Sequence, residues 1–310
     1  MERTRNPEDS IAWLFTVVPT IFVIIGLLFF SIAVSEEFRV PISIPLFSSL
    51  FLLGIGFFIK RNKIASKIKI IGWIIFAFFW STKINELYFG VDGDIVNAFL
   101  CIAGIYVLFY MAYHEWLSLK RKEQVECLNW FAGVASLAGF IYFGVELTPL
   151  APWLIDTVAA NSGWLLNLFT GNVEVYGPNI YISGVFAVNI IFACTAMQST
   201  VIFVGMILPL KKVKLDKKFY GLLATVVPIY FLNMIRNGLI AYLLAEDITS
   251  FYIAHNIIGK GGSLIALVIL LLVVVKIVPE VFDEIICLSD LYKRNGPLER
   301  FFGKIFGRKK

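Results

Sequence analysis

A cysteine, an arginine and a histidine in the C-terminal half of the sequence have the types and spacing that suit nucleophilic catalysis. Cys194 lies in the segment Phe192–Ser199, near the start of an apolar run of membrane length. Arg236 lies inside the next apolar run, and His255 lies just past the far end of that run. An imidazole can accept the proton of a thiol, and a guanidinium can stabilise the negative oxygen that forms when the thiolate attacks a carbonyl. These residues therefore predict acylation of Cys194, release of the leaving segment, and transfer of the acyl group to a second nucleophile or to water.

Each of these residues also has an ordinary structural explanation. A cysteine in a membrane helix is most often a small packing residue, which is the explanation that suits Cys101 among its large apolar neighbours. A membrane arginine can extend to the interface or pair with an acid of another helix, although burying its charge is costly. His255 could be an interfacial histidine, an explanation that suits His114 better. Six polar neighbours are expected to support the site or to bind substrate: Thr195, Gln198, Ser199, Asn233, Asn237 and Asn256.

Composition places the chain among multi-pass membrane proteins. Its 310 residues are 59% hydrophobic and only 16% charged, whereas a soluble domain is nearer one quarter charged. The net charge of +5 lies in short loops between apolar runs, so it indicates topology rather than nucleic-acid binding. The four cysteines are too scattered for a disulfide framework or a metal motif, and neither a metal nor another cofactor is expected.

The apolar runs predict an all-α polytopic fold with about eight transmembrane helices. The lysine-rich loops all fall on one side, so both termini are predicted to be cytoplasmic and Cys194, Arg236 and His255 to lie toward the extracytoplasmic side. Cys194 is expected about six residues into the sixth helix. The predicted helices are Ile11–Val34, Ile44–Ile59, Ile70–Tyr88, Ile95–Tyr113, Leu128–Glu146, Val188–Leu210, Phe219–Leu244 and Ser263–Val278.

The longest outer connection, residues 146–186, is predicted to form a small extracytoplasmic cap. Pro149–Phe169 mixes tryptophans and leucines with polar residues, a pattern typical of an amphipathic helix at the membrane interface. Val173–Ile182 contains a Gly-Pro-Asn turn and predicts two short strands. The whole chain, residues 1–310, is expected to form one integral-membrane domain. Its last segment, residues 288–310, is expected to be a basic cytoplasmic tail.

The sequence resembles the exosortase/archaeosortase family of membrane transpeptidase-like enzymes, and within it most closely the archaeosortase A group. The resemblance rests on three segments: Ala193-Cys-Thr-Ala-Met-Gln-Ser199, Asn233-Met-Ile-Arg-Asn237, and Ala254-His-Asn256 followed by Gly259. It covers the helical core and is most specific between Cys194 and Gly262.

The resemblance implies an extracytoplasmic site in which Cys194 is the nucleophile and Arg236 stabilises the oxyanion. His255 would be the base or a second charge stabiliser, because some archaeal members carry arginine at its position. The implied substrates are secreted or surface proteins with a C-terminal signal that consists of a short motif, a hydrophobic helix and a basic tail. The archaeosortase A group recognises a PGF-type motif and links processing to attachment of a membrane lipid, which implies a lipid acceptor.

Two other kinds of protein remain compatible with the residues alone. A transporter or channel could use Arg236 for an anionic substrate, and it would not need Cys194. A membrane scaffold would need neither residue for chemistry.

Overall fold

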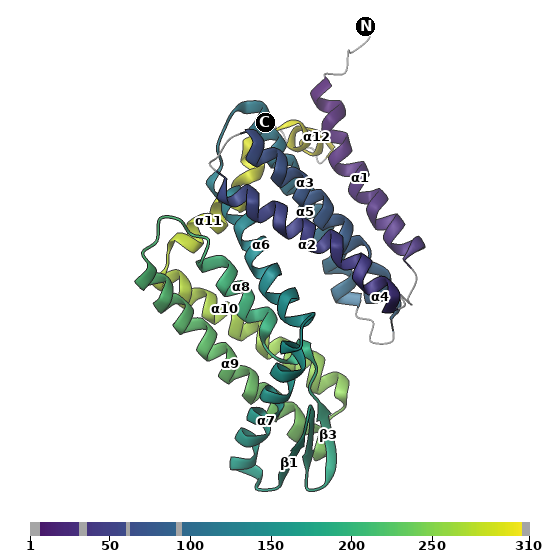
Figure 1. The fold of residues 1–310 in the computed structure, drawn as a ribbon, viewed down its shortest axis with the longest axis vertical. Coiled ribbons are helices and arrows are strands. Elements are labelled where there is room, and N and C mark those ends of the chain that lie inside the picture. Colours follow the sequence, from purple (N-terminus) through teal and green to yellow (C-terminus); the bar gives the residue numbers. More distant parts are fainter. Residues whose placement is uncertain (1–6, 31–35, 60–62, 91–94, 306–310) are drawn as a thin grey trace. The chain divides into compact units, whose positions relative to one another are not determined.

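The computed structural model describes residues 7–30, 36–59, 63–90 and 95–305 (Figure 1). The loop predictions that involve residues 31–35, 60–62 and 91–94, and the last basic residues of the tail, lie outside the described residues. The chain forms two compact units, one of residues 1–136 with 284–310 and the other of residues 137–283. The prediction of a single domain over 1–310, with its cap and tail as separate segments, is not tested by this division and stays a prediction.

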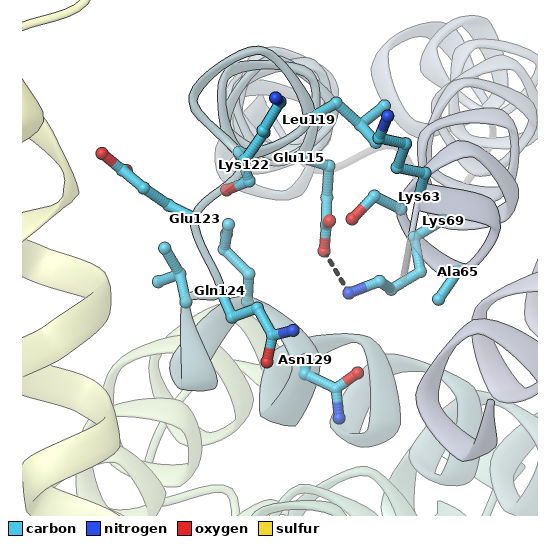
Figure 2. Close-up of a pocket in the computed structure, with 13 residues that line it drawn as sticks. Lys63, Ala65, Lys69, Glu115, Leu119, Lys122, Glu123, Gln124 and Asn129 are labelled. Carbon is cyan, nitrogen blue, oxygen red and sulfur yellow. Dashed lines mark ion pairs between the residues drawn. The ribbon is translucent and has the colours of Figure 1, made fainter. Parts of the chain in front are cut away.

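Unit 1, residues 1–136 with 284–310, is built on long apolar helices. Its core lies where α3 packs against both α2 and α5, with Leu50, Trp73 and Ile105 fully or almost fully buried. Within this apolar core, Lys69 and Glu115 form an ion pair with Nζ 2.5 Å from Oε1 (Figure 2). The helices are α1 (Pro7–Phe29), α2 (Glu36–Phe58), α3 (Lys63–Ser81), the short α4 (Ile84–Phe89), α5 (Ile95–Arg121) and the first part of α6 (Glu126–Glu146).

The C-terminal segment of unit 1 is folded onto α5. The end of α11 (Glu280–Ser289) leads into the 3-10 turn η3 (Asp290–Arg294) and then into α12 (Pro297–Ile305). Arg294 Nη1 donates to the backbone carbonyl of His114 at 3.1 Å, which ties η3 to α5. The described part of the predicted basic tail therefore has helical structure and packs on the helix bundle.

A disulfide between Cys127 and Cys287 joins α6 to α11 within unit 1. The expectation that the cysteines are too scattered to pair was wrong for these two. They are 160 residues apart in sequence, so no local spacing pattern could reveal the pairing. Cys101 and Cys194 are the free cysteines of the described chain, and both are buried.

Unit 2, residues 137–283, surrounds the longest helix of the protein, α9 (Leu215–Ala245). The predicted cap helix is present as α7 (Leu150–Thr170), which packs one face on α9 and on β1 and leaves Trp153 and Trp164 exposed. The remaining elements are the end of α6, β1 (Val173–Tyr176), β2 (Asn179–Ile182), β3 (Val185–Asn189), η1 (Phe192–Cys194), α8 (Met197–Ile207), the π-helical segment η2 (Ile253–Gly259), α10 (Lys260–Ile277) and the start of α11.

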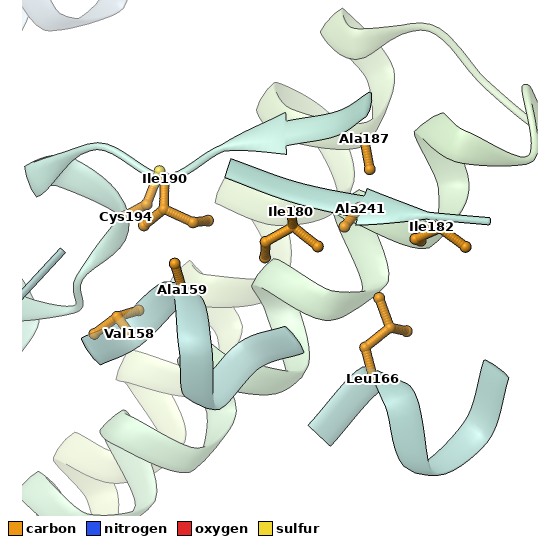
Figure 3. Packing of buried hydrophobic residues seen from close by; sticks show 9 residues of the cluster. All are labelled: Val158, Ala159, Leu166, Ile180, Ile182, Ala187, Ile190, Cys194 and Ala241. Atoms are coloured by element: carbon orange, nitrogen blue, oxygen red, sulfur yellow. The ribbon is translucent and has the colours of Figure 1, made fainter. Parts of the chain in front are cut away.

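The predicted hairpin is confirmed, but the sheet has a third strand. β1, β2 and β3 form an antiparallel sheet in that order. Buried residues of α7, the sheet and α9 form one apolar cluster, and Cys194 belongs to it (Figure 3). The cluster consists of Val158, Ala159, Leu166, Ile180, Ile182, Ala187, Ile190, Cys194 and Ala241.

The sixth predicted helix, Val188–Leu210, is wrong in its first half. The structure divides this run into the end of β3, the 3-10 turn η1 and the shorter helix α8. Pairing with β2 provides hydrogen-bond partners for backbone that would otherwise be helical. Cys194 therefore precedes the helix instead of lying six residues into it.

Helices of membrane length dominate both units. Six helical segments of the described chain are long and apolar enough to cross a membrane, and two shorter apolar helices, Trp13–Phe29 and Met197–Ile207, accompany them. The six are Pro41–Phe58, Lys63–Phe89, Ile95–Arg121, Glu126–Glu146, Leu215–Ala245 and Ile253–Ile277. The prediction of a helical multi-pass membrane protein with about eight membrane helices and a small β-containing cap is confirmed.

Candidate active site

Cys194 lies on a tight turn between a strand and a helix. It is the last residue of η1, its N–H donates to the carbonyl of Ile191 at 2.8 Å, and α8 begins three residues later. The side chain of Thr195 folds back on the same turn, with Oγ1 donating to the carbonyl of Phe192 at 2.7 Å.

Ala196, between the turn and α8, has a left-handed backbone conformation with φ of 63°. A residue with a Cβ atom adopts this conformation at a cost of roughly 1 kcal/mol or more, so surrounding contacts must hold it. The N–H of Thr200 donates to the carbonyl of Ala196 at 3.0 Å and begins the helix. Strain is therefore concentrated two residues from the thiol.

Two asparagines of α9 hold the backbone of Cys194. The Nδ2 atoms of Asn233 and Asn237 donate to the carbonyl oxygen of Cys194, at 2.8 and 3.0 Å. The two residues are four apart, so they lie on one face of the helix, and both are buried. A carbonyl has two lone pairs, and this arrangement uses both of them, which fixes the turn to α9.

Arg236 projects from the same stretch of α9 toward η2. A Cβ atom on Gly259 would lie 3.1 Å from Arg236 Nε and 2.9 Å from the side chain of Ile240. Glycine at this position therefore allows the guanidinium to approach the backbone of η2. Arg236 Nε is buried without a hydrogen-bond partner, and no carboxylate of the described chain forms an ion pair with this arginine. The ordinary explanation of a paired membrane arginine is thus not supported within the described residues.

His255 lies in η2, a π-helical segment that continues directly into α10. Segments of this kind are rare and often occur at functional sites. The ring is half-buried, stacks on Phe251 with centroids 5.1 Å apart, and has Nδ1 3.4 Å from Oδ1 of Asn256. His255 is also close enough to Arg236 for the two side chains to interact electrostatically. His255 lies past the end of α9, as predicted, but it lies in helical backbone and not in a connection between the predicted seventh and eighth helices.

The other polar candidates have more varied surroundings. Gln198, in the first turn of α8, donates from Nε2 to Tyr142 Oη at 3.4 Å. The ring of Tyr142 also contacts Phe192, so this residue of α6 touches the turn on which Cys194 lies. Sequence reasoning did not identify Tyr142, and nothing in its local sequence pointed to the turn. Ser199 is half-buried in α8.

The structure links the three main candidates through α9. Asn233 and Asn237 contact the turn of Cys194, while Arg236 on the same helix approaches η2, which carries His255. Among the described residues, no hydrogen bond joins the thiol of Cys194 directly to Arg236 or His255. The arrangement therefore brings the predicted residues to neighbouring elements of one unit, with the backbone of Cys194 as the best-fixed part.

The described residues contain one group that could hold a metal ion by composition, Cys127 with Glu284 and Cys287. It lies in unit 1, and its two sulfurs are bonded to each other. It is separate from the residues of the candidate site.

The fold and this site define a multi-pass helical membrane protein with a buried free thiol on a strand–turn–helix connection. The family model described as transmembrane exosortase matches residues 46–274, so the chain belongs to this family. It is 24% identical over 265 residues to archaeosortase A of Haloferax volcanii, an alignment that covers 73% of this chain and 85% of the relative. No solved structure matches the chain.

Proposed function

We propose that this protein is a membrane-embedded cysteine transpeptidase that processes C-terminal sorting signals of secreted or surface proteins. Membership in the transmembrane exosortase family and the likeness to an archaeosortase support a membrane sorting enzyme of transpeptidase type. The observation that carries the cysteine mechanism is the turn of Cys194. Its carbonyl is held by two amides of the helix that also presents Arg236 toward the segment of His255.

In the proposed first step, the Cys194 thiol gives its proton to His255 and the sulfur attacks the scissile carbonyl. The tetrahedral intermediate carries a negative oxygen, which Arg236 stabilises. Collapse of the intermediate breaks the C–N bond, the imidazolium gives its proton to the leaving amine, and a thioester remains on Cys194. An alternative role for His255 is to stabilise charge beside Arg236, with the proton leaving by another acceptor.

In the second step, the hydroxyl or amine of an acceptor attacks the thioester, and its proton returns through His255 to the thiol. A membrane lipid is the proposed acceptor, and water is the competing one. The half-buried state of His255 and the burial of Cys194 favour a site with little water, in which an oriented acceptor competes well.

The proposed substrate has a PGF-type motif, a hydrophobic helix and a basic tail. The active site is proposed to lie on the extracytoplasmic side with both termini in the cytoplasm, so the motif at the outer end of the substrate helix would reach it. Unpartnered Arg236 Nε is a group that such a substrate could satisfy.

The decisive experiment follows processing of a secreted protein with a PGF-type C-terminal signal, co-expressed with the full-length enzyme. Cys194→Ala is expected to abolish processing, a loss of at least about 10³-fold, because the nucleophile is missing. The readout is the mass and C terminus of the substrate. Cys101→Ala is the matched control, since Cys101 is the other buried free cysteine of the described chain and its thiol donates a hydrogen bond to the backbone carbonyl of Trp80.

Full processing by Cys101→Ala with none by Cys194→Ala, at equal membrane levels of both variants, is the expected result. Undiminished processing by Cys194→Ala would overturn the cysteine mechanism. It would favour a transport function, in which Arg236 matters and the thiol does not.

A further inference from the structure

A polar cavity of about 160 Å³ lies in unit 1, where α3 begins, α5 ends and α6 begins. Its lining includes three lysines and two glutamates: Lys63, Lys69, Lys122, Glu115 and Glu123. Figure 2 shows the Lys69–Glu115 ion pair between Asn129 on one side and Lys63 and Lys122 on the other. The cavity is smaller than a typical drug-sized pocket and suits a compact polar group.

The glutamates of the cavity are already neutralised. Glu115 pairs with Lys69, and both side chains are almost fully buried. Glu123 Oε2 lies 3.0 Å from Arg294 Nη2, a cation outside the cavity lining. Lys63 and Lys122 are exposed and have no ion pair or hydrogen bond among the described residues. Two uncompensated positive charges therefore remain at the mouth of the cavity.

Lys122 has a left-handed backbone, with φ of 55°, in the loop that follows α5. Glycine or asparagine would adopt this conformation more easily, so the lysine here has a conformational cost. In this conformation, the ammonium of Lys122 is the second positive charge at the mouth of the cavity, together with that of Lys63.

Asn129, at the floor of the cavity, offers a hydrogen-bond acceptor. Asn129 is 2% exposed, and its Oδ1 has no partner, while Nδ2 makes only a long contact of 3.5 Å to the carbonyl of Phe57. A buried acceptor without a donor is costly, so a ligand that brings a hydroxyl to Asn129 would relieve that cost. The cavity thus combines a cationic mouth with an acceptor at its floor.

We propose that this cavity binds a phosphoglycerol group, with the phosphate between Lys63 and Lys122 and a glycerol hydroxyl donating to Asn129 Oδ1. Such a group occurs as the headgroup of an anionic phospholipid or free as glycerol phosphate. The lipid is favoured because the cavity lies at the ends of membrane-length helices, where headgroups lie, and exposed Ile64 and Ile71 continue along α3 from Lys63.

A basic peptide is a poor occupant because neither glutamate has a free charge to offer. The predicted topology puts this end of unit 1 on the cytoplasmic side, whose leaflet commonly carries anionic lipids. The cavity lies in unit 1 and the proposed catalytic residues lie in unit 2, so this inference does not depend on the proposed reaction.

The test measures binding of phosphatidylglycerol to the purified full-length protein by native mass spectrometry, with phosphatidylcholine as the neutral comparison. The double variant Lys63→Gln/Lys122→Gln is expected to weaken phosphatidylglycerol binding roughly 30-fold, about fivefold for each lysine. The matched control is Lys67→Gln/Lys120→Gln, which removes the same charge from exposed positions of α3 and α5 that lie near Lys63 and Lys122 in sequence but outside this cavity. That control is expected to change binding by less than about threefold.

Equal weakening by both double variants would overturn the site, because it would show attraction to surface charge alone.

Asn129→Leu is expected to remove the preference for phosphatidylglycerol over phosphatidic acid, which lacks the second glycerol. An unchanged preference would overturn the role of the cavity floor. Free glycerol phosphate is added as a competitor. Failure to displace the lipid at millimolar concentration supports the lipid as the occupant, whereas displacement at micromolar concentration would overturn that choice.

Discussion

Each unit has an arginine near a histidine, Arg294 and His114 in unit 1 and Arg236 and His255 in unit 2, and the two pairs differ in how many contacts they make. In unit 1, His114 is fully buried, accepts from Arg294 Nη1 at Nδ1 over 3.1 Å, and has Nε2 3.2 Å from Glu299 Oε1. Because a guanidinium only donates, Nδ1 is the acceptor and the ring hydrogen lies on Nε2. In unit 2, His255 is half-buried and contacts its neighbour Asn256, while Arg236 Nε has no partner among the described residues.

The difference separates polar groups that hold the fold from groups available for chemistry. A buried network with satisfied members makes a protein more stable and more rigid, whereas unpaired cations in a membrane helix are costly and mark functional sites. The same contrast holds for the free cysteines, since Cys101 contacts a helix carbonyl and Cys194 lies on a strained turn. Substitutions of Arg294 or His114 should therefore reduce stability, and substitutions of Arg236 or His255 should reduce activity.

The largest effect after loss of the nucleophile is expected at the two arginines. Arg236→Gln should lower the rate of substrate processing by about 10³-fold, because a fixed positive charge near the developing oxyanion is lost. Its thermal unfolding temperature should stay equal or rise, since the variant removes an uncompensated charge. Arg294→Gln should keep processing within a few fold and lower the unfolding temperature. Both effects are measured on purified protein and in the co-expression assay. Destabilisation by Arg236→Gln as large as that by Arg294→Gln would contradict the comparison.

The two histidines should show the same contrast as the two arginines, with a smaller loss of processing rate. His255→Gln should slow processing by about 10²-fold with little change in stability, as expected when proton transfer is removed. His114→Gln should destabilise unit 1 and leave the rate per folded molecule unchanged. Comparing His255→Arg with His255→Gln assigns the role of this residue. Recovery of activity by arginine would indicate charge stabilisation, and continued inactivity would indicate a base.

The asparagines of α9 are expected to act jointly. Asn233→Ala or Asn237→Ala leaves one amide on the carbonyl of Cys194, so each should slow processing only a few fold and cost about 1 kcal/mol of stability. The double variant leaves the carbonyl without either donor and should slow processing by more than the product of the single effects. Asn161→Ala, which breaks a 2.6 Å bond to Tyr230 in the same unit, is the control. A simple product of single effects would argue against this role in positioning the turn.

Motif resemblance selected the residues of the candidate site, hydropathy predicted most of the elements that carry them, and tertiary pairing explains what hydropathy missed. The run around Arg236 predicted a helix near the observed bounds, and the Gly-Pro-Asn turn predicted the hairpin, whereas the helical segment of His255 was not predicted. The run from Val188 to Leu210 has its one proline, Pro209, at the far end, and no proline, glycine or charged residue lies close to Cys194. Its hydropathy is therefore the same for a continuous helix as for a strand, turn and helix. The choice is made by pairing of β3 with β2 and by the asparagines of α9.

The disulfide and the folded tail were missed for the same physical reason. Cys127 and Cys287 are 160 residues apart in sequence, and their local sequences contain no pairing signal. The segment after Cys287 reads as a basic tail, yet Glu299 inserts among tyrosines of α5 and makes the helix dock. Long-range contacts of this kind are invisible to composition and periodicity.

The smallest effect on processing is expected at two carboxylates, one in each unit, whose substitution should change stability alone. In unit 1, burial alone would raise the pKa of Glu299, but its contacts with His114 and Tyr113 outweigh burial and lower that pKa below its usual value. A lowered pKa in the folded protein means that the carboxylate stabilises the fold fully above about pH 4.5 and loses that contribution as the pH falls through the folded pKa. Glu299→Gln should thus lower stability by about 2 kcal/mol at pH 7 and by less at acidic pH.

Glu280 of unit 2 pairs with Lys217 in a half-exposed bridge, so Glu280→Gln should change stability much less at any pH. Thermal unfolding of both variants and wild type between pH 3.5 and pH 7 provides the measurement. Because burial is what distinguishes the two pairs, equal effects would contradict the expectation that the buried contacts of Glu299 stabilise the protein more than the half-exposed pair does.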